Sequence, residues 1–407
     1  MSRIVLKFGG TSVGSVERIN HVAKIVKSEV DLGNQIVVVL SAMAGETDRL
    51  INLTKELSSG FQDSEYDVVI SSGEQVSAGA LSGLLNSLGI KAQSRLGWQI
   101  PIVTSGDHKS ARIEVIHSKE LINLLELNEV IVIPGFQGIN SEGRITTLGR
   151  GGSDTSAVAI AAAIDADFCD IYTDVDGVYT SDPNKVPTAK RLDKISYEEM
   201  LEMASLGAKV LQTRSVETAM NNDVVLRVLS SFSDIGEDKK GTLVCPEDSI
   251  ADKKIVTGVA ASTNDSKLTL TGIKDKPGVA AEILSELADD GINVDMIVQN
   301  ISQDGISANI TFTISQKDFD LTKSVIEQNR NSLSYKSLSL DKNVAKISVI
   351  GMGMMSQAGV AEKMFKTLAK NEINILAIST SEIKISVLIE EKHTNIAVKS
   401  LHEAYNL

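Results

Sequence analysis

The sequence has few cysteines, no excess of basic residues and no long apolar run, and each shortage excludes a class of protein. Cys169 and Cys245 are too few for a disulfide framework, so we expect reduced thiols and a cytoplasmic location. Forty Lys and Arg against 53 Asp and Glu give a net charge of −13, which excludes nucleic acid and anionic membranes as expected partners. No apolar stretch reaches membrane-spanning length, and the N-terminus lacks the features of a signal peptide.

Common phosphate-binding and metal-binding motifs are also missing. There is no GxxxxGK[ST] motif, which excludes a P-loop enzyme, and no GxGxxG follows the first expected strand. No two of the five histidines have metal-ligand spacing, so we expect no structural metal site. A length of 407 residues predicts two or three domains.

The most informative stretch is Thr147–Val178. A glycine-bracketed turn at 149–152 leads to Ser153 and Asp154, and an uninterrupted helix-forming run starts at Thr155. Ser or Asp at such a junction predicts a helix N-cap, and free amides beside glycines favour an anion. For this turn taken alone, an ordinary loop-to-helix junction is the better interpretation than a phosphate site.

Strand and helix patterns alternate through the first 245 residues. A strand at Arg3–Phe8, a helix at Val16–Val30 and a Val-rich strand at Gln35–Leu40 predict a βαβ unit and a parallel sheet covered on both faces. Further along we expect a helix capped by Thr47, a helix or helix pair over Tyr66–Leu88 with a break near Ser71–Gly73, a β excursion at Ile102–His117, a helix at Ser118–Leu127, strands at Glu129–Pro134 and Phe168–Val175, a helix at Tyr197–Leu211 capped by Ser196, and a final strand at Val224–Ser230. The pattern predicts a three-layer, open, mainly parallel α/β domain.

Two glycine loops in this domain suit a polyphosphate. Lys7, Gly9 and Gly10 follow the first strand, and 149–154 precedes a helix. Open α/β sheets bind ligands at these positions, where amides cradle phosphates and cations offset their charge. A solvated lysine at the strand end is the alternative interpretation of Lys7.

The last third of the chain contains an internal repeat with an offset of 81 residues. PGVA at 277–280 recurs as AGVA at 358–361, and ILSELADDGINV at 283–294 recurs as MFKTLAKNEINI at 364–375. Such a repeat predicts two duplicated structural units.

The first copy reads as a βαββαβ, ferredoxin-like module, with elements expected at 267–272, 279–290, 294–301, 307–314, 318–329 and 334–340. The second copy has elements expected at 345–350, 360–370, 375–380, 384–389 and 393–405, and it lacks a fourth strand. We expect the apolar stretch Ile255–Ala260 to fill that vacancy, so that the first module is inserted in the second. The predicted domains are 1–245, a linker and strand at 246–262, and modules at 263–342 and 343–407.

Six linked motifs, in the same order and over essentially the whole chain, resemble those of aspartate kinases: KFGGTSVGS at 7–15, SAMAGETD at 41–48, SSGEQVSA at 71–78, GFQGIN at 135–140, TTLGRGGSDTSA at 146–157 and YTDVDGVYTSDP at 172–183. The resemblance implies the amino-acid-kinase fold with two C-terminal ACT modules. It implies that ATP and L-aspartate give ADP and 4-phospho-L-aspartate, with Mg²⁺ carried by ATP, as the first step towards lysine, threonine and methionine. A glutamate or acetylglutamate kinase and a catalytically silent amino-acid sensor are the alternatives.

The resemblance also implies roles for single residues. The expected catalytic residues are Lys7, Asp154 and Lys209. The expected ATP-binding residues are Lys7, Phe8, Gly9, Gly10, Ser41, Thr173, Asp174, Tyr179, Asp182, Pro183, Asn184 and Lys209. The expected substrate-binding residues are Thr47, Glu74, Arg150, Gly151, Gly152 and Ser153.

The chemistry of this reaction makes its own demands. A side-chain carboxylate with a pKa of about 3.9 is already ionised at neutral pH, so no general base is needed. A zwitterionic substrate needs one fixed cation and one fixed anion, and Arg150 and Glu74 match that demand. A solvated helix charge is the alternative interpretation of Glu74.

ACT modules sense amino acids, and the resemblance implies lysine and/or threonine as feedback effector. The expected effector-binding residues are Asp275, Lys276, Pro277, Gly278, Val279, Ala280, Asn293, Val294, Asp295, Gln299, Ser379, Thr380 and Ser381. Exposed strand edges also favour a homodimer or larger homo-oligomer through these modules. A dimerisation scaffold without effector is the alternative. Ala358 in place of Pro277, and the Met-rich loop at 351–355, leave open whether both modules bind one.

Overall fold

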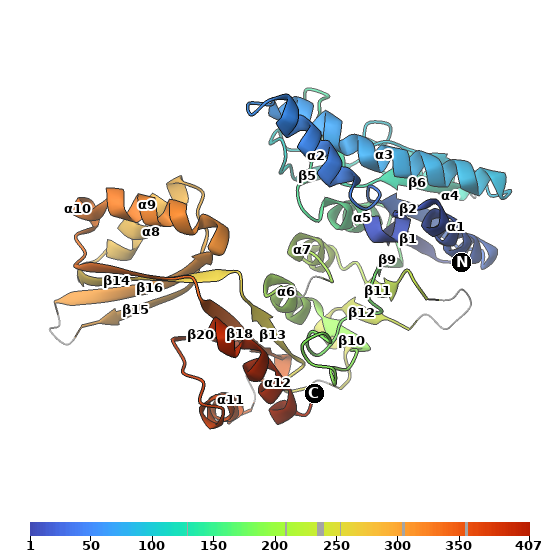
Figure 1. The fold of residues 1–407 in the computed structure, drawn as a ribbon. Coiled ribbons are helices and arrows are strands. Elements are labelled where there is room, and N and C mark those ends of the chain that lie inside the picture. Colours follow the sequence, from blue (N-terminus) through green and yellow to red (C-terminus); the bar gives the residue numbers. More distant parts are fainter. Residues whose placement is uncertain (128, 208–209, 234–239, 253, 303–305, 355–356) are drawn as a thin grey trace. The chain divides into compact units, whose positions relative to one another are not determined.

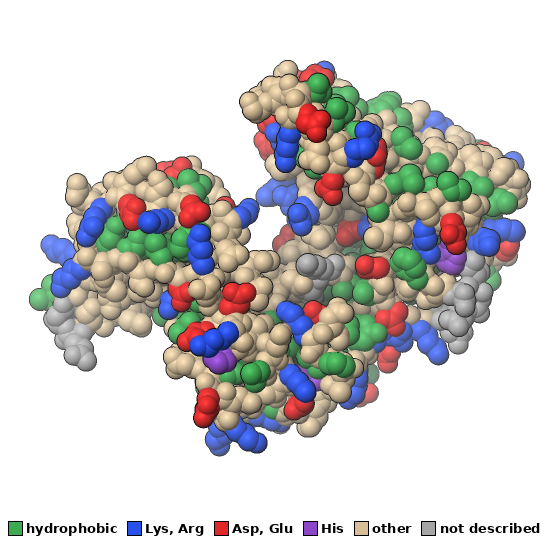
Figure 2. All heavy atoms as spheres, in the orientation of Figure 1, with side chains coloured by type: hydrophobic (Ala, Val, Ile, Leu, Met, Phe, Trp, Pro, Cys, Tyr) green, Lys and Arg blue, Asp and Glu red, His purple; other side chains and the backbone are tan. Residues whose placement is uncertain are grey.

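The structure, a computed structural model, describes residues 1–127, 129–207, 210–233, 240–252, 254–302, 306–354 and 357–407 (Figure 1). The chain divides into two compact units, one made of 1–178 and 191–252 and the other of 179–190 and 253–407. Within the described residues, no helix is both long enough and apolar enough to cross a membrane. Acidic and basic side chains are interspersed on the face of each unit that Figure 2 shows. The domain bounds expected at 245, 262 and 342 stay predictions.

The central sheet of the first unit contains eight described strands: β1 (Arg3–Phe8), β2 (Gln35–Leu40), β3 (Ala92–Ser94), β6 (Val130–Pro134), β9 (Phe168–Thr173), β10 (Lys194–Ser196), β11 (Leu226–Ser230) and β12 (Thr242–Cys245). Their order is β10-β12-β11-β9-β1-β2-β6-β3. All neighbours pair in parallel except β11 and β12, so the expected mainly parallel sheet is confirmed.

Helices cover this sheet because the expected apolar faces are present. They are α1 (Val16–Asp31), α2 (Glu46–Leu57), α3 (Asp63–Ser87), α4 (Lys119–Glu126), α5 (Gly152–Ala163), α6 (Tyr197–Ser205) and α7 (Thr213–Asn221). Apolar side chains of α1 and α3 share one buried core with β1, β2 and β6. Helix α5 contacts β1, β9 and α7. A second sheet contains β5 (Ile113–Ile116), β4 (Ile102–Thr104), β7 (Gln137–Ile139) and β8 (Ile145–Thr147), in that order.

Two predicted helix caps in this unit are wrong. Helix α2 starts at Glu46 after Gly45, so Thr47 lies inside its first turn and does not cap it. Helix α5 starts at Gly152 after Gly151, which has a φ of 74°, so Ser153 and Asp154 also lie in the first turn. A glycine with left-handed φ allows each turn to enter its helix without a side-chain cap.

The break expected at Ser71–Gly73 is also absent, because α3 is continuous there. Gly73 has a packing role instead. A Cβ atom added to it would lie 2.8 Å from Cβ of Ala42, so only glycine allows the loop after β2 to approach the helix this closely.

The end of the first unit differs from the prediction in two respects. Strand β11, expected as the final strand of the domain, is followed in the chain by β12. In the sheet, β12 lies between β11 and β10. The helix expected at Tyr197–Leu211 ends at Ser205, and a separate helix α7 follows. Ser196 does cap α6, in a capping box with Glu199 as its reciprocal partner.

The second unit contains two four-stranded antiparallel sheets with the order β15-β16-β14-β17 and β13-β18-β20-β19. The strands are β13 (Gly258–Ser262), β14 (Asp265–Lys274), β15 (Val294–Ile301), β16 (Ser307–Ser315), β17 (Ser337–Asp341), β18 (Val344–Ile350), β19 (Ala377–Thr380) and β20 (Lys384–Glu390). The helices are α8 (Val279–Asp289), α9 (Phe319–Gln328), α10 (Arg330–Leu333), α11 (Val360–Lys370) and α12 (Thr394–Tyr405).

The strand before the first module fills the vacancy in the second. Strand β13 pairs with β18 of the second module, with Gly258 opposite Ile350. In the first module, β17 has the equivalent edge position beside β14. The insertion of the first module in the second is therefore confirmed, although the strand lies at 258–262 and not at 255–260.

Candidate active site

The end of β1 and the start of α5 carry a largely buried ion pair. Lys7 Nζ lies 2.5 Å from Asp154 Oδ1, and each residue is 8% exposed. Lys7 lies on a central strand between β2 and β9, and Asp154 lies in the first turn of α5. The lysine predicted from the strand end is therefore not a solvated surface charge.

This ion pair borders a cavity of about 400 Å³. The lining comes from the loops after β1 and β2, the middle of α3 and the glycine turn before α5. Its residues are Lys7, Gly9, Gly10, Ser41, Ala42, Met43, Ala44, Gly45, Thr47, Glu74, Phe136, Gly149, Arg150, Gly151, Gly152, Ser153, Asp154 and Gln212. The structure thus brings all the expected substrate residues and most of the expected phosphate loop into one cavity at the carboxyl ends of parallel strands.

Glu74 contributes a buried carboxylate with one uncommitted oxygen. Its Oε1 accepts a hydrogen bond from Ala42 N at 3.1 Å. Its Oε2 is buried and has no hydrogen-bond partner within the described part of the chain. Burial raises the pKa of Glu74 to about 7, against the smaller opposite effect of the bond from Ala42. A positively charged ligand group beside Oε2 would satisfy this oxygen and favour its ionised form.

Arg150 contributes a cation on the glycine turn. Its side chain is exposed and lines the cavity. Among the residues that the structure describes, none forms a hydrogen bond or ion pair with the Arg150 guanidinium. Counted over the described residues, the cavity therefore contains one uncommitted cation and one uncommitted carboxylate oxygen, both of which a zwitterion requires.

The expected nucleotide residues are distributed differently. Phe8 is fully buried and stacks on Tyr172 with ring centroids 4.6 Å apart, so its side chain belongs to the core. Thr173 ends β9, and its hydroxyl donates to Asp174 Oδ1 at 3.1 Å. Neither Thr173 nor Asp174 lines the cavity.

Four other expected nucleotide residues, namely Tyr179, Asp182, Pro183 and Asn184, belong to the second unit. There the backbone N–H of Asn184 donates to Asp182 Oδ1 at 2.9 Å, which closes a tight turn. Lys209, expected as a catalytic residue, lies outside the described residues.

The expected effector residues lie at the turn before α8, on or beside β15, and at the end of β19. Gly278 precedes α8 with a φ of 93°, and Gly359 precedes α11 with a φ of 95°. Asp295 is already paired, because Lys346 Nζ lies 2.5 Å from its Oδ2. Ser379 and Thr380 lie on β19, and Ser381 N donates to Lys384 O at 2.8 Å just beyond it.

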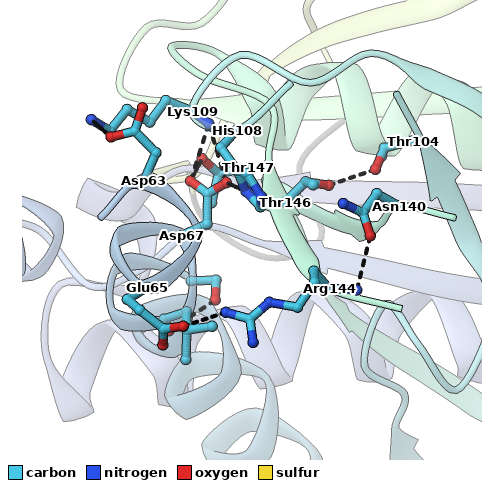
Figure 3. Close-up of polar contacts among 12 residues, drawn as sticks. Asp63, Glu65, Asp67, Thr104, His108, Lys109, Asn140, Arg144, Thr146 and Thr147 are labelled. Atoms are coloured by element: carbon cyan, nitrogen blue, oxygen red, sulfur yellow. Dashed lines mark hydrogen bonds and ion pairs between the residues drawn. The ribbon is translucent and has the colours of Figure 1, made fainter. Parts of the chain in front are cut away.

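The interpretation of the sequence missed Asp67 and its partners, which Figure 3 shows beside the second sheet. Asp67 is fully buried on α3 and binds His108, Lys109 and Thr147. A carboxylate seven residues before Glu74, on the same apolar helix, was the available signal. Gln212 and Phe136 of the cavity lining were also missed.

Comparisons with known proteins show the family of the chain. The model of the amino acid kinase family matches residues 2–230, and an ACT domain model matches 268–329 and 347–405. An aspartate kinase of Pseudomonas fluorescens is 50% identical to the chain, over all of the chain and 98% of its own length. The chain belongs to the aspartate kinases of the amino acid kinase family.

Solved aspartate kinase structures have the same architecture. E. coli aspartokinase III in complex with aspartate and ADP has a TM-score of 0.82 at 28% identity, with 98% of this chain and 99% of that one covered. The same E. coli enzyme in complex with lysine and aspartate has a TM-score of 0.76 at 27% identity, with 98% of both chains covered. The expected family and fold are therefore confirmed.

Proposed function

We propose that the chain transfers the γ-phosphoryl group of ATP to the side-chain carboxylate of L-aspartate, giving ADP and 4-phospho-L-aspartate. The observation that supports this most directly is the cavity itself. It combines the Lys7–Asp154 pair with the uncommitted Glu74 Oε2 and the uncommitted Arg150. An anion-to-anion transfer of this kind needs charge cancellation and alignment and no proton abstraction.

Substrate recognition follows from the two opposite charges. Arg150 would bind the α-carboxylate of aspartate, and Glu74 Oε2 would accept from its ammonium group. The Thr47 and Ser153 hydroxyls and the amides of Gly151 and Gly152 would complete the polar lining. The substrate side-chain carboxylate would then face the Lys7–Asp154 pair.

Phosphate binding involves the other side of the cavity. Gly9, Gly10 and Ser41 line it beside Lys7, and backbone N–H groups at a helix start favour an anion. Lys7 would offset the charge on the transferred phosphoryl group. Thr173, Asp174, the turn at Tyr179–Asn184, and Lys209 complete the proposed nucleotide site by their resemblance to the family motifs.

Magnesium would enter with the nucleotide. Within the described residues, no cluster of three or more acidic, histidine or cysteine side chains could hold a metal by itself. The Asp154 carboxylate is buried in the cavity wall, and no described residue other than Lys7 donates to its Oδ1. Such a carboxylate fits an ion held mainly by phosphate oxygens. Bound there, Mg²⁺ would neutralise phosphate charge.

We further propose that the ACT modules bind lysine and/or threonine and join two or more subunits. Support comes from the repeated glycine turns before α8 and α11 and from the lysine complex of the E. coli enzyme. The reaction would then be the feedback-regulated first step towards lysine, threonine and methionine.

A coupled assay with ATP and Mg²⁺, in which hydroxylamine traps the acyl phosphate, tests the activity. Aspartate should give product, and glutamate and N-acetylglutamate should give little. Preference for either of the latter would identify another amino-acid kinase, and no product from any would identify a silent sensor. Titration with lysine, threonine and both together identifies the effector.

A further inference from the structure

Asp67 holds two segments of chain that are far apart in the sequence (Figure 3). Its Oδ1 accepts from the Thr147 hydroxyl at 2.6 Å, and its Oδ2 lies 2.7 Å from His108 Nδ1. Both carboxylate oxygens also accept from the Lys109 backbone N–H, at 3.2 and 3.1 Å. Asp67 and Thr147 are both fully buried, so these bonds are shielded from water.

These two segments support the glycine turn that carries Arg150. Thr147 is the last residue of β8, two residues before Gly149, and its carbonyl accepts from Ala111 N at 2.9 Å. A Cβ atom added to Gly149 would lie only 3.0 Å from the Lys109 carbonyl oxygen. Lys109 itself has a left-handed φ of 66°, which is uncommon outside glycine, and its one backbone N–H is shared by both Asp67 carboxylate oxygens. The turn therefore rests on a backbone that Asp67 fixes.

Asp67 and Glu74 also share one face of α3. They are seven residues apart, which is close to two helical turns and about 10 Å along the axis. The helix is continuous between them. One rigid helix thus carries the carboxylate proposed for the substrate ammonium and, two turns earlier, the carboxylate that anchors the turn bearing Arg150.

We propose that Asp67, with Thr147 and His108, is a positioning group that sets the separation between Glu74 and Arg150 and so the fit of the α-ammonium and α-carboxylate groups of the amino-acid substrate. This inference rests on the substrate roles proposed above for those two residues. Asp67 touches no substrate in this scheme. Its removal would let the glycine turn move relative to α3, and the ammonium and carboxylate sites would lose their alignment.

The test compares D67N, T147V and H108N in the full-length chain. D67N removes the negative charge of Asp67 and keeps the size of its side chain. T147V removes the hydroxyl that donates to Asp67 and keeps the shape of the side chain. H108N replaces the ring that contacts Asp67 with a shorter side chain. The readouts are KM for aspartate, KM for ATP and Tm. We expect D67N and T147V to raise KM for aspartate about ten-fold, with KM for ATP changed less than about two-fold.

Two matched controls lie in the same region (Figure 3). T104V removes the buried hydrogen bond between Thr104 and Thr146, whose hydroxyl oxygens lie 2.5 Å apart. Glu65 lies on α3, the helix of Asp67, and E65Q weakens its exposed ion pair with Arg144. T104V should lower Tm without changing KM for aspartate, and E65Q should change neither.

Folded D67N and T147V proteins with wild-type KM for aspartate, or with an equal rise in KM for ATP, would overturn the proposal. If D67N does not fold, T147V and H108N decide by the same criteria. A wild-type chain without aspartate-dependent activity would overturn the proposed function as well, whereas an active wild type with unaffected variants would overturn this inference alone.

Discussion

Thr180 Oγ1 lies 2.9 Å from Nε2 of His402, and both residues are buried in the second unit. Thr180 belongs to the segment 179–190, which lies in the chain between the two parts of the first unit but packs with the ACT modules. Its carbonyl accepts from Val259 N at 2.8 Å, and Val186 is part of the core around β18 and α12. A segment with four expected nucleotide residues is therefore packed into the unit that contains the ACT modules.

This relationship predicts a pH-dependent contribution to stability. Burial, aided by the charge of Lys190 and opposed by Glu403, lowers the pKa of His402 below its ordinary 6.5. The folded state then binds fewer protons than the unfolded state, so the contribution of neutral His402 is present above pH 6.5 and is lost as pH falls below it. We expect H402Q to be about 1 kcal/mol less stable than wild type at pH 8, and the difference to narrow at pH 5.5 in urea unfolding. A difference independent of pH would contradict the assignment.

Glu74 predicts a pH dependence of substrate binding. Because its pKa is raised to about 7, the substrate-free site is largely protonated below neutral pH. An ammonium group binds the ionised form, so kcat/KM for aspartate should rise with pH up to about 7 and then level off. The E74Q variant should lose this inflection in the pH profile. Its KM for aspartate should rise, with a loss in transition-state binding free energy on the order of 1–3 kcal/mol.

The same carboxyl has the opposite effect on the free enzyme. A carboxyl whose folded pKa exceeds the unfolded value of 4.5 binds its proton more tightly when folded. The stability of the substrate-free wild type should therefore fall relative to E74Q as pH rises from about 4.5 through about 7. Unchanged relative stability would contradict the raised pKa of Glu74, and an unchanged KM for aspartate in E74Q would exclude the ammonium role.

Lys7 predicts a loss of turnover. K7A removes the cation beside Asp154 and the transferred phosphoryl group, and we expect kcat to fall about 10²-fold or more. Circular dichroism and thermal unfolding should show a folded protein, since β1 keeps its apolar residues and its pairing with β2 and β9. A folded K7A protein with near-normal kcat would remove Lys7 from the mechanism.

Gly73 predicts a conflict between helix propensity and packing. An alanine in a helix interior gains about 1 kcal/mol over glycine, but overpacking costs about 1–3 kcal/mol. At Gly73 the new Cβ would lie 2.8 Å from Ala42, whose N–H binds Glu74, so G73A should be destabilised and should raise KM for aspartate. At Gly79 of the same helix the new Cβ has no atom within 4 Å, so G79A should be slightly stabilised with unchanged KM. Equal effects of the two changes would refute the packing argument.

Local patterns were sufficient for much of the fold. Alternating apolar strands and amphipathic helices predicted β1, α1 and β2 closely, and Ser196 predicted the start of α6. Helix starts after Gly45 and Gly151 were mispredicted because backbone conformation replaces a side-chain cap there. The false break at Ser71–Gly73 arose because a glycine needed for packing resembles a helix breaker.

The sequence by itself determined the glycine loops. It also determined that the second module lacks its fourth strand and that a strand before the first module replaces it. These features could be predicted because periodicity and internal repeats can be recognised in the sequence alone. Only the tertiary structure decided that Lys7 meets Asp154, that Asp67 joins Lys109 to Thr147, and that 179–190 packs with the ACT modules. These contacts join residues that are tens to hundreds of positions apart. Their geometry and the pKa of Glu74 depend on burial by the whole unit, which no local pattern encodes.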